Sequence, residues 1–205
     1  PTEFGGAGLG ITERAIILEE VSRHSAGLGI AIMTHDLATA AILNHASEEL
    51  KKEWLPKLCS AEVIGGLSVT EPTGGSDLAN QATTIEKTED GYILNGRKVF
   101  ITNSHIADLN IWTGTSGVNE KGRKVLSALL IPPETEGLTA GRKENKLGLR
   151  GSVTGDTIAK DVKVPLNCLV GKEGKGANIA LHTIGHFGRS GMSAIALGII
   201  RGCVE

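Results

Sequence analysis

The sequence predicts an α+β fold with an N-terminal helical region, a middle antiparallel β-sandwich or barrel, and the start of a C-terminal helical bundle. Three observations predict it. Apolar residues recur every three or four positions before residue 60, alternate with polar ones from about residue 62, and return to helical spacing after residue 176. We therefore expect helices over 1–61, a β-domain over 62–172 and one truncated bundle helix over 173–205.

The N-terminal region is expected to contain three helices. Thr12 is a candidate N-cap for the first helix. The second spans about 28–44, because this segment carries an apolar stripe at helical spacing: Ile30, Met33, Leu37 and Ala41. Ser47 can cap the third helix, and Pro56 is expected to break or kink it because proline has no amide hydrogen to donate.

The middle region alternates apolar and polar residues, which is typical of strands. We expect a strand over 63–70 and three strands within 83–102, separated by turns at Asp90-Gly91 and Asn95-Gly96. Further strands are expected around 108–115, 125–131 and 157–164, with turn signals at Pro132-Pro133 and Glu136-Gly137. Short strands at this spacing predict a sandwich or barrel.

The last segment, from Ala177 to Glu205, contains no proline and is expected to be one helix. Small residues recur every four positions along it: Ser190, Ala194, Gly198 and Gly202. Such a strip lets another helix approach closely. We expect this to be the first helix of a bundle whose other helices lie outside the chain.

Composition excludes several classes of function. The 205 residues include 21 Lys and Arg against 23 Asp and Glu, a formal net charge of -2, so no global positive field attracts nucleic acid. No uninterrupted apolar run approaches the roughly 18 residues of a membrane-spanning helix. We expect neither a nucleic-acid partner nor a membrane span. Because the chain begins at Pro1 and ends at Glu205 inside a predicted helix, we expect it to be part of a longer protein.

The spacing of cysteine and histidine disfavours a metal site. Cys59, Cys168 and Cys203 lie far apart without a C-x-x-C pair, which indicates a reducing compartment and no zinc ribbon. His182 and His186 are four residues apart on a predicted helix, but no third ligand accompanies them. We expect no metal.

Glycine-rich segments do not match a dinucleotide or nucleoside-triphosphate site. The segments at 5–10 (GGAGLG) and 171–177 (GKEGKGA) lack the G-x-G-x-x-G spacing, and no Walker motif occurs. A nicotinamide dinucleotide bound on a parallel sheet is therefore disfavoured.

The segment 66–78 (GLSVTEPTGGSDL) is a candidate binding loop. A predicted strand ends at Thr70, and consecutive glycines follow it. Glycines leave backbone N–H groups open in a concavity, which with Ser76 can bind a phosphate or pyrophosphate. Thr70 and the peptide groups of Leu67 and Val69 could contact a flat polar heterocycle. The alternative is an ordinary loop between two strands.

The segment 95–104 (NGRKVFITNS) is a second candidate. Period-two alternation places Phe100 and Thr102 on one face of a strand, an aromatic ring beside a hydroxyl. This pair could stack on a ring system and hydrogen-bond to its edge. The alternative is a pair on a solvated face of the sheet.

Three motifs in this order resemble the acyl-CoA dehydrogenase family of flavoproteins. They are TEPTGGSD (70–77), DGYILNGRKVFITNS (90–104) and KLGLRGSVTGDTIAKDVKVPLNCLVGKEGKG (146–176). The opening PTEFGGAGLG and the later ASEELKKEWLPKLCSAE (46–62) resemble the N-terminal helical region of the family. The resemblance extends over essentially the whole chain.

The resemblance implies a fold, a cofactor and partners. Family members have an N-terminal helical domain, a β-domain and a C-terminal four-helix bundle, and are homotetramers or dimers. FAD lies between the β-domain and the bundle, with part of its site donated by a neighbouring subunit. The implied substrate is an acyl-CoA, and the implied electron acceptor is an electron-transferring flavoprotein.

The resemblance also implies the residues that contact FAD. They are Leu67, Val69, Thr70, Gly75, Ser76, Phe100, Ile101 and Thr102. Phe100 stands where many members have tryptophan, which keeps an aromatic face but loses an N–H. Thr102 matches the hydroxyl that bonds flavin N5.

Substrate contacts are implied for a second set of residues. Ser76 approaches the acyl-CoA in relatives, and Ser116 matches a further contact. His186 and Arg189 lie where the corresponding helix meets CoA, and Arg189 matches an arginine near the catalytic carboxylate. Part of the second-helix stripe falls where relatives shape the acyl pocket, with core packing as the alternative: Ile30, Met33 and Leu37.

The implied reaction oxidises an acyl-CoA thioester to the trans-2-enoyl-CoA. A carboxylate takes the α-proton while the β-hydrogen leaves as hydride to flavin N5. In the family this carboxylate lies either downstream of the position of Glu205 or directly before the arginine matched by Arg189. Gly188 occupies the second position and cannot act as a base. We therefore expect no catalytic base in this chain, and an inactive fragment when it is isolated.

Other functions remain open at this point. An acyl-CoA oxidase, a nitroalkane oxidase or a flavin monooxygenase shares the fold and the FAD loops. A non-catalytic FAD-binding relative, or an α+β domain without a cofactor, is also an alternative. A bacterial or archaeal cytoplasm and a mitochondrial matrix all fit the expected reducing environment.

Overall fold

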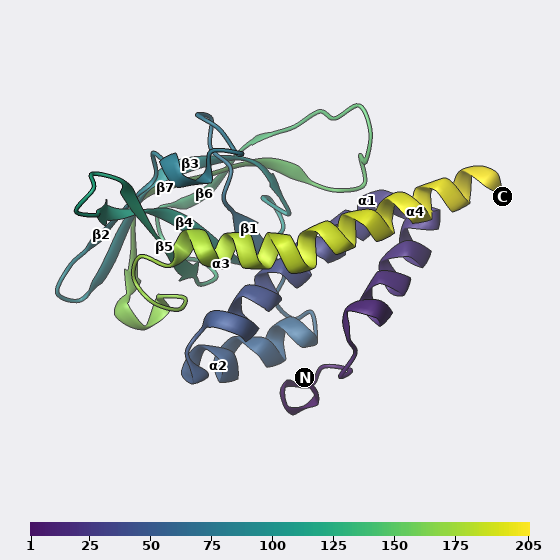
Figure 1. Ribbon diagram of the computed structural model, residues 1–205, viewed down its shortest axis with the longest axis horizontal. Coiled ribbons are helices and arrows are strands. Elements are labelled where there is room, and N and C mark those ends of the chain that lie inside the picture. Colours follow the sequence, from purple (N-terminus) through teal and green to yellow (C-terminus); the bar gives the residue numbers. More distant parts are fainter.

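The computed structural model describes residues 1–205 and places helices against a curled seven-stranded sheet (Figure 1). Two helices precede the sheet, α1 (Ile11–His45) and α2 (Glu48–Cys59), after a short turn η1 (Thr2–Phe4). The strands are β1 (Gly65–Ser68), β2 (Thr84–Lys87), β3 (Gly91–Thr102), β4 (Leu109–Val118), β5 (Lys124–Ile131), β6 (Leu138–Lys143) and β7 (Thr154–Pro165). Short turns η2 (Leu78–Asn80) and η3 (Leu166–Cys168) lie in the connections, and α3 (Gly176–Thr183), η4 (Ile184–Gly188) and α4 (Arg189–Val204) complete the chain.

The first two predicted helices are the two halves of α1. The helix begins at Ile11 rather than after Thr12, because the carboxylate of Glu13 accepts a hydrogen bond from the backbone N–H of Gly10. Ser25 is the point of the kink, with φ −151° and ψ 89°. A Cβ at the neighbouring Gly27 would lie 2.9 Å from the Cα of Gly151, so the kinked helix meets a loop of the β-domain without intervening side chains.

Helix α2 confirms one prediction and contradicts another. The Ser47 hydroxyl caps it by accepting from the backbone N–H of Leu50 at 3.3 Å. Pro56 does not break it, because the helix continues to Cys59. Proline removes one hydrogen bond near the end of the helix, while burial of an apolar face that includes Trp54 stabilises the helical conformation.

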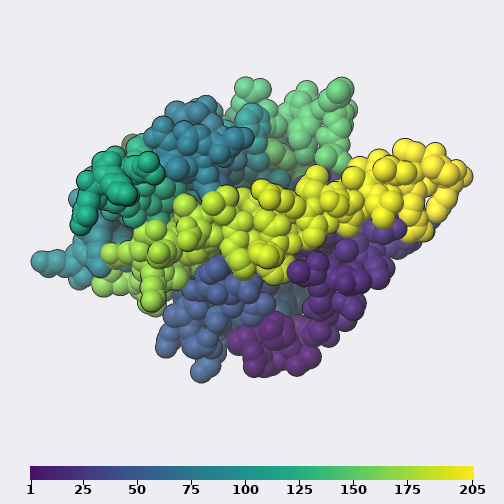
Figure 2. Space-filling view, viewed as in Figure 1, coloured from purple at the N-terminus to yellow at the C-terminus, as the bar shows by residue number.

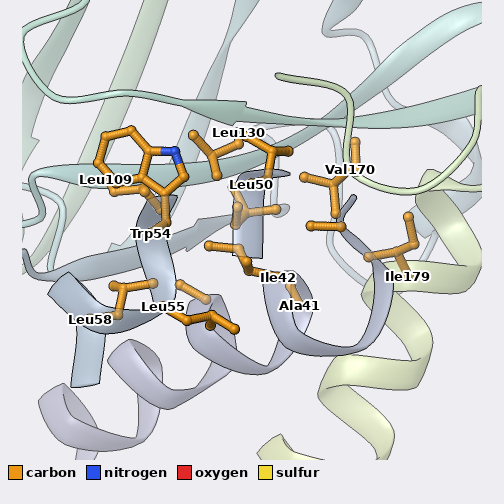
Figure 3. Close-up of a cluster of buried hydrophobic side chains, with 14 of the residues drawn as sticks. Ala41, Ile42, Leu50, Trp54, Leu55, Leu58, Leu109, Leu130, Val170 and Ile179 are labelled. Carbon is orange, nitrogen blue, oxygen red and sulfur yellow. The ribbon is translucent and has the colours of Figure 1, made fainter. Parts of the chain in front are cut away.

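A single apolar core joins α1, α2 and the sheet. Fifteen buried residues form it, and Figure 3 shows side chains from both helices pointing toward the strands. The labelled residues are Ala41, Ile42, Leu50, Trp54, Leu55, Leu58, Leu109, Leu130, Val170 and Ile179. Burial of such side chains is worth about 1.5–3 kcal/mol each, so this contact fixes the helices on the sheet.

The α+β class is confirmed, and the sheet is mixed rather than purely antiparallel. Its strand order is β1-β4-β2-β3-β7-β6, with β5 paired to β4. Strands β1 and β4 run parallel, and β2 meets β4 in parallel at Thr84 and Thr115. Parallel pairs form between strands that no tight hairpin connects, and alternation within one strand does not report its neighbour. The strand β6 was not predicted.

The turn at Asp90-Gly91 is confirmed, but Asn95-Gly96 lies inside β3 and not in a turn. Residues 83–102 therefore form two strands rather than three. Asn95 is held in the sheet by Asp161, which donates its N–H to the side-chain oxygen at 2.8 Å. A Cβ at Gly96 would lie 2.3 Å from the Thr83 hydroxyl oxygen, so glycine is needed here for close packing.

The C-terminal segment is one continuous helical rod, α3–η4–α4, widened to a π-turn at Ile184–Gly188. Its strip of small residues packs on the first half of α1, and Figure 2 shows α4 lying over that segment. A Cβ at Gly202 would lie 2.5 Å from the carbonyl oxygen of Arg23. The helix that approaches Gly198 and Gly202 of the strip is therefore α1 of this chain, whereas we expected bundle helices outside the chain to do so.

Helix α1 is long and apolar enough, by length and composition alone, to cross a bilayer. An 18-residue window in it has a mean hydropathy of 1.5, and half of that window is buried inside the fold. The prediction that no segment reaches membrane-spanning length considered only uninterrupted apolar runs. The apolar sequence of α1 is interrupted by polar residues such as His35 and Asp36. The burial is that of a helix packed in a protein core.

Candidate functional site

The two predicted binding segments lie side by side. The backbone N–H of Val99 donates to the carbonyl oxygen of Thr70 at 2.9 Å. This bond joins the loop that follows β1 to strand β3, one residue before Phe100 and three before Thr102. The candidate site is therefore built from residues 67–76 and 100–102.

Phe100 sits at a bulge in β3 and is presented to solvent. The pairing of β3 with β7 shifts register between Lys98 and Ile101, so β3 carries one extra residue there. Phe100 has φ +57° and is 64% exposed. A left-handed conformation is costly for an aromatic residue, and such strain together with a bulge is common beside active sites.

The neighbours of Phe100 alternate as the sequence indicates. Ile101 is buried at 3% exposure, and Thr102 is half-buried. Thr102 pairs with Thr154 at the end of β3. The exposed ring and the Thr102 hydroxyl thus belong to the same end of the same strand.

The loop after β1 turns sharply within four residues. Glu71 and Gly74 exchange both backbone hydrogen bonds, at 3.0 and 3.2 Å, and close a tight turn over Pro72 and Thr73. Gly74 has φ +152°. Gly75 packs on Thr70, where an added Cβ would lie 3.1 Å from the methyl carbon, and Ser76 is exposed beside it.

A buried ion pair lies beneath this loop. Lys98 Nζ is 2.8 Å from Glu71 Oε1, and the two side chains are 0% and 2% exposed. Burial lowers the pKa of Lys98 to about 8, although the Glu71 carboxylate opposes the shift. Burial alone would raise the pKa of Glu71, but hydrogen bonds from Lys98 and from the backbone N–H groups of Ala82 and Thr83 hold it below its ordinary value.

Sequence reasoning did not single out Lys98. Alternation in the sequence places Lys98 on the face of Phe100 and Thr102, so it does not indicate burial. In the structure Lys98 and Val99 are both buried, because the bulge that begins there breaks the alternation. A charged residue on the inner side of a strand requires a partner. That partner, Glu71, stands in the TEPTGGSD motif at the start of the loop.

Leu67 and Val69 have different surroundings. Leu67 pairs with Ile111 of β4 and packs its side chain against the helical core. The carbonyl of Val69 accepts from Lys98 Nζ at 3.1 Å and from Gln81 Nε2 at 3.3 Å. That carbonyl is engaged inside the protein, so it does not face a ligand.

Of the predicted substrate residues, Ser76 lies in the loop that carries Thr70, whereas Ser116, His186 and Arg189 lie on other elements. The Ser116 hydroxyl lies 2.7 Å from that of Ser127, on β4 and β5. His186 and Arg189 are exposed on the helical rod, and no hydrogen bond or ion pair joins them to the candidate site. Gly188, which occupies the alternative base position, is buried in the π-turn.

The helix stripe assigned to an acyl pocket packs in the core instead. Met33 and Leu37 are 7% and 8% exposed. A Cβ at Gly191 of α4 would lie 2.8 Å from Met33 Cγ, so the methionine fills the space between two helices. Core packing was the alternative interpretation of this stripe, and the burial of Met33 and Leu37 agrees with it.

Histidines cluster near the rod without forming a metal site. His182 Nδ1 is 3.1 Å from His45 Nε2, and the rings of His182 and His186 are 4.7 Å apart. Burial lowers the pKa of His45, and His182 adds to the shift. No group of three or more His, Cys, Asp or Glu side chains in residues 1–205 has the arrangement of a metal-ion site.

Comparison with known proteins places this geometry in a family. The model described as "Acyl-CoA dehydrogenase, N-terminal domain" matches residues 1–62, and the one described as "Acyl-CoA dehydrogenase, middle domain" matches residues 66–162. The acyl-CoA dehydrogenase of Bacillus subtilis (strain 168) is 39% identical over 206 residues, which cover 100% of this chain and 54% of that protein.

Two solved structures superpose on 98–100% of this chain. The butyryl-CoA dehydrogenase of Megasphaera elsdenii superposes with a TM-score of 0.94 at 33% identity, covering 100% of this chain and 54% of that one. A structure described as the FAD complex of PigA superposes with a TM-score of 0.88 at 31% identity, covering 98% of this chain and 53% of that one. The chain spans about half the length of the curated relatives it matches. Because the two family models match residues 1–62 and 66–162 and the Megasphaera elsdenii structure superposes over 100% of the chain, the chain belongs to the acyl-CoA dehydrogenase family.

Proposed function

We propose that the protein containing this chain is an FAD-dependent oxidoreductase that converts an acyl-CoA thioester to the trans-2-enoyl-CoA. The observation that carries the proposal is the contact between the two candidate segments, in which Val99 donates to Thr70 beside the strained and exposed Phe100. The names of the Bacillus subtilis and Megasphaera elsdenii relatives support the reaction class, and the FAD complex of PigA supports the cofactor.

The residues of the candidate site fit a flavin in their chemistry. A tricyclic ring needs an aromatic face to stack on and hydrogen-bond donors at its edge. Phe100 offers an exposed ring, and Thr102 offers a hydroxyl two residues away. The loop beside them approaches Thr70 at Gly75, where an added Cβ would lie 3.1 Å from the Thr70 methyl carbon. We propose that FAD contacts Thr70, Gly75, Ser76, Phe100, Ile101 and Thr102, and that Leu67 and Val69 contribute through backbone groups other than the Val69 carbonyl.

When bound, FAD supplies a two-electron acceptor for the hydride that leaves the β-carbon of the substrate. The protein residues hold and shield the reacting groups. Phe100 would cover one ring face and limit access of water, and the Thr102 hydroxyl would donate a hydrogen bond at the ring edge. Neither Gly188 nor the buried Glu71, which is engaged by Lys98, can accept the α-proton. We therefore place the base downstream of Glu205.

Substrate contacts are proposed for residues around the β-domain and the rod. Arg189 is a permanent cation suited to the phosphates of CoA, and His186 lies one helical turn before it. Ser76 can donate to the substrate from the loop, whereas Ser116 would first have to exchange its bond to Ser127. The butyryl-CoA dehydrogenase name among the relatives supports a short acyl chain.

The assembly and location of the whole protein are part of the proposal. We propose a homotetramer or dimer that passes electrons to an electron-transferring flavoprotein. The division into 1–61, 62–172 and 173–205 is kept as our proposed domain organisation. The three unpaired cysteines support a reducing compartment, either a prokaryotic cytoplasm or a mitochondrial matrix.

The test uses the full-length protein. Purified protein is expected to be yellow with bound FAD, and anaerobic addition of butyryl-CoA is expected to bleach the flavin, followed by slow reoxidation in air. Phe100→Ala should weaken FAD binding while leaving the fold intact, because the ring is exposed. A panel of acyl-CoA chain lengths then ranks the substrates.

Three outcomes would contradict the proposal in different ways. A colourless protein that does not take up FAD would remove the flavoprotein assignment. Fast peroxide formation after reduction would indicate an oxidase. Bound FAD that no acyl-CoA reduces would indicate a non-catalytic relative.

A further inference from the structure

A single buried cation holds both ends of the candidate FAD loop. Lys98 Nζ donates to the carbonyl of Val69 and the carboxylate of Glu71 where the loop begins, at 3.1 and 2.8 Å. It also donates to the side-chain oxygen of Gln81 where the loop ends, at 3.0 Å. These three bonds use every proton of the ammonium group.

Glu71 makes the second half of this clamp. Its Oε1 accepts from Lys98 and from the backbone N–H of Thr83 at 3.0 Å, and its Oε2 accepts from the N–H of Ala82. The carboxylate therefore ties residue 71 to residues 82 and 83, across the base of the loop. Gln81 adds a bond from its Nε2 to the Thr113 hydroxyl at 2.9 Å, which anchors the loop to β4.

The clamp shares its strand with the other half of the candidate site. Lys98 lies two residues before Phe100, and the register shift of the bulge begins at Lys98. The position of Lys98 thus sets both the loop that carries Thr70, Gly75 and Ser76 and the start of the bulge that presents Phe100. An apolar side chain could fill the same volume, but it would not fix the direction of three polar groups.

We propose that Lys98 and Glu71, with Gln81, are positioning residues of the flavin site, because together they hold the loop over 70–83 in register with the bulge at Phe100. This inference rests on the proposed FAD site and goes beyond it. It assigns the affinity and environment of the flavin to groups that do not touch it. Residues that orient the ligands of metal sites from behind change affinity by about 10- to 100-fold when they are lost, and we expect a change in the same range for FAD.

The experiment measures FAD binding to the full-length apoprotein by fluorescence titration, together with the visible absorption spectrum of the bound flavin. Lys98→Met and Glu71→Gln are each expected to raise the dissociation constant of FAD about tenfold or more and to blur the flavin absorption bands. Both are also expected to lower Tm, because each leaves one charge buried without its partner.

The double variant Lys98→Met/Glu71→Gln separates positioning from stability. With no buried charge left, Tm is expected to recover, while FAD affinity stays about tenfold below the wild type because the directional bonds are absent. Leu55→Ala is the matched control, since Leu55 is buried in the helical core, a cluster that contains no residue of the loop over 70–83. It should lower Tm and leave FAD affinity within twofold of the wild type.

Two results would show that Lys98 and Glu71 serve stability alone, and either one overturns the inference. One is a recovery of FAD affinity together with Tm in the double variant. The other is that the single variants match Leu55→Ala in FAD affinity and flavin spectrum. If the ionic single variants do not fold, Gln81→Met carries the test, because it removes one acceptor from Lys98 without leaving a charge unpaired. Unchanged FAD affinity in Gln81→Met overturns the inference. A wild-type apoprotein that does not bind FAD overturns the proposed function itself.

Discussion

Gly198 of α4 lies against the backbone of Glu19 in α1, so closely that a Cβ at Gly198 would stand 2.2 Å from the Glu19 carbonyl oxygen. The side chain of Glu19 reaches across the same interface to Arg201, with 2.6 Å between the carboxylate and the guanidinium. Because Gly198 has no side chain, α4 can contact α1 closely at this position, and the ion pair between Glu19 and Arg201 lies at the border of the contact. Because the pair is partly exposed, we expect it to contribute little, at most about 1 kcal/mol.

Gly198→Ala is expected to destabilise the protein by about 1–3 kcal/mol, because the added methyl group forces two backbones apart. Gly185→Ala is the matched control, since a Cβ there would meet nothing within 4 Å. Alanine should be neutral at Gly185 or raise stability by up to about 1 kcal/mol through helix propensity. Urea unfolding of both variants measures the difference, and equal midpoints would contradict the close contact.

Phe100→Gly is expected to leave the stability of the apoprotein unchanged or raise it by about 1 kcal/mol. Glycine adopts positive φ without steric cost, and the lost ring is mostly exposed. Ile101→Gly, at the next position, removes a buried side chain and is expected to cost about 2–5 kcal/mol. A loss of stability in Phe100→Gly as large as in Ile101→Gly would show that the ring is part of the core.

Tyr92 is expected to ionise only at high pH. Burial raises the pKa of its phenol to about 12, and the hydroxyl donates to Glu173 at 2.8 Å, which adds to the shift. Because the pKa in the folded state exceeds the ordinary value, the neutral phenol stabilises the fold below about pH 10, and this contribution is lost as the pH rises toward 12.

The phenolate absorbance of the wild type minus that of Tyr92→Phe isolates this residue, which is the only tyrosine in the chain. A difference titration with a midpoint near the ordinary value of about 10 would rule out the buried hydrogen bond to Glu173.

Thiol reactivity should divide the three cysteines. Burial raises the pKa of Cys168 to about 11, whereas Cys59 and Cys203 are exposed. Since the thiolate is the reactive form, alkylation at neutral pH should modify Cys59 and Cys203 and spare Cys168 until the protein is denatured. Peptide mapping after iodoacetamide treatment identifies which cysteines are alkylated, and rapid labelling of Cys168 in the native state would disprove its burial.

Acid unfolding should depend on Glu71. Hydrogen bonds keep the pKa of this carboxylate below its ordinary value, so its stabilising contribution is present above that value and is lost as the pH falls through the lowered pKa. Glu71→Gln should be less stable than the wild type near neutral pH, and the gap should narrow as the pH falls. The urea midpoint of both proteins between neutral and acidic pH tests this, and a constant gap would contradict the ionised pair.

Much of the fold was predictable from local signals. The Ser47 cap, the apolar stripe of the second helical segment and the turn at Asp90-Gly91 depend on neighbours in the sequence, so patterns in the sequence report them. Asn95-Gly96 misled the prediction. The same dipeptide that favours a hairpin turn also suits a position where Thr83 packs against the backbone.

The candidate site was only partly predictable, for a related reason. The motifs near Thr70 and Phe100 are contiguous in the sequence, and their polar, glycine-rich or aromatic composition marked them. The hydrogen bond from Val99 to Thr70 and the clamp of Lys98 on Glu71 join residues about thirty positions apart. No periodicity within a segment encodes such a pairing.

Local propensity and motif identity thus account for the helices, most strands and the family of this protein. The parallel pairing of β1 with β4, the bulge that exposes Phe100 and the closure of α4 onto α1 depend on contacts between distant segments. These contacts form only when the chain is compact, because burial and steric fit then outweigh the preference of each segment alone.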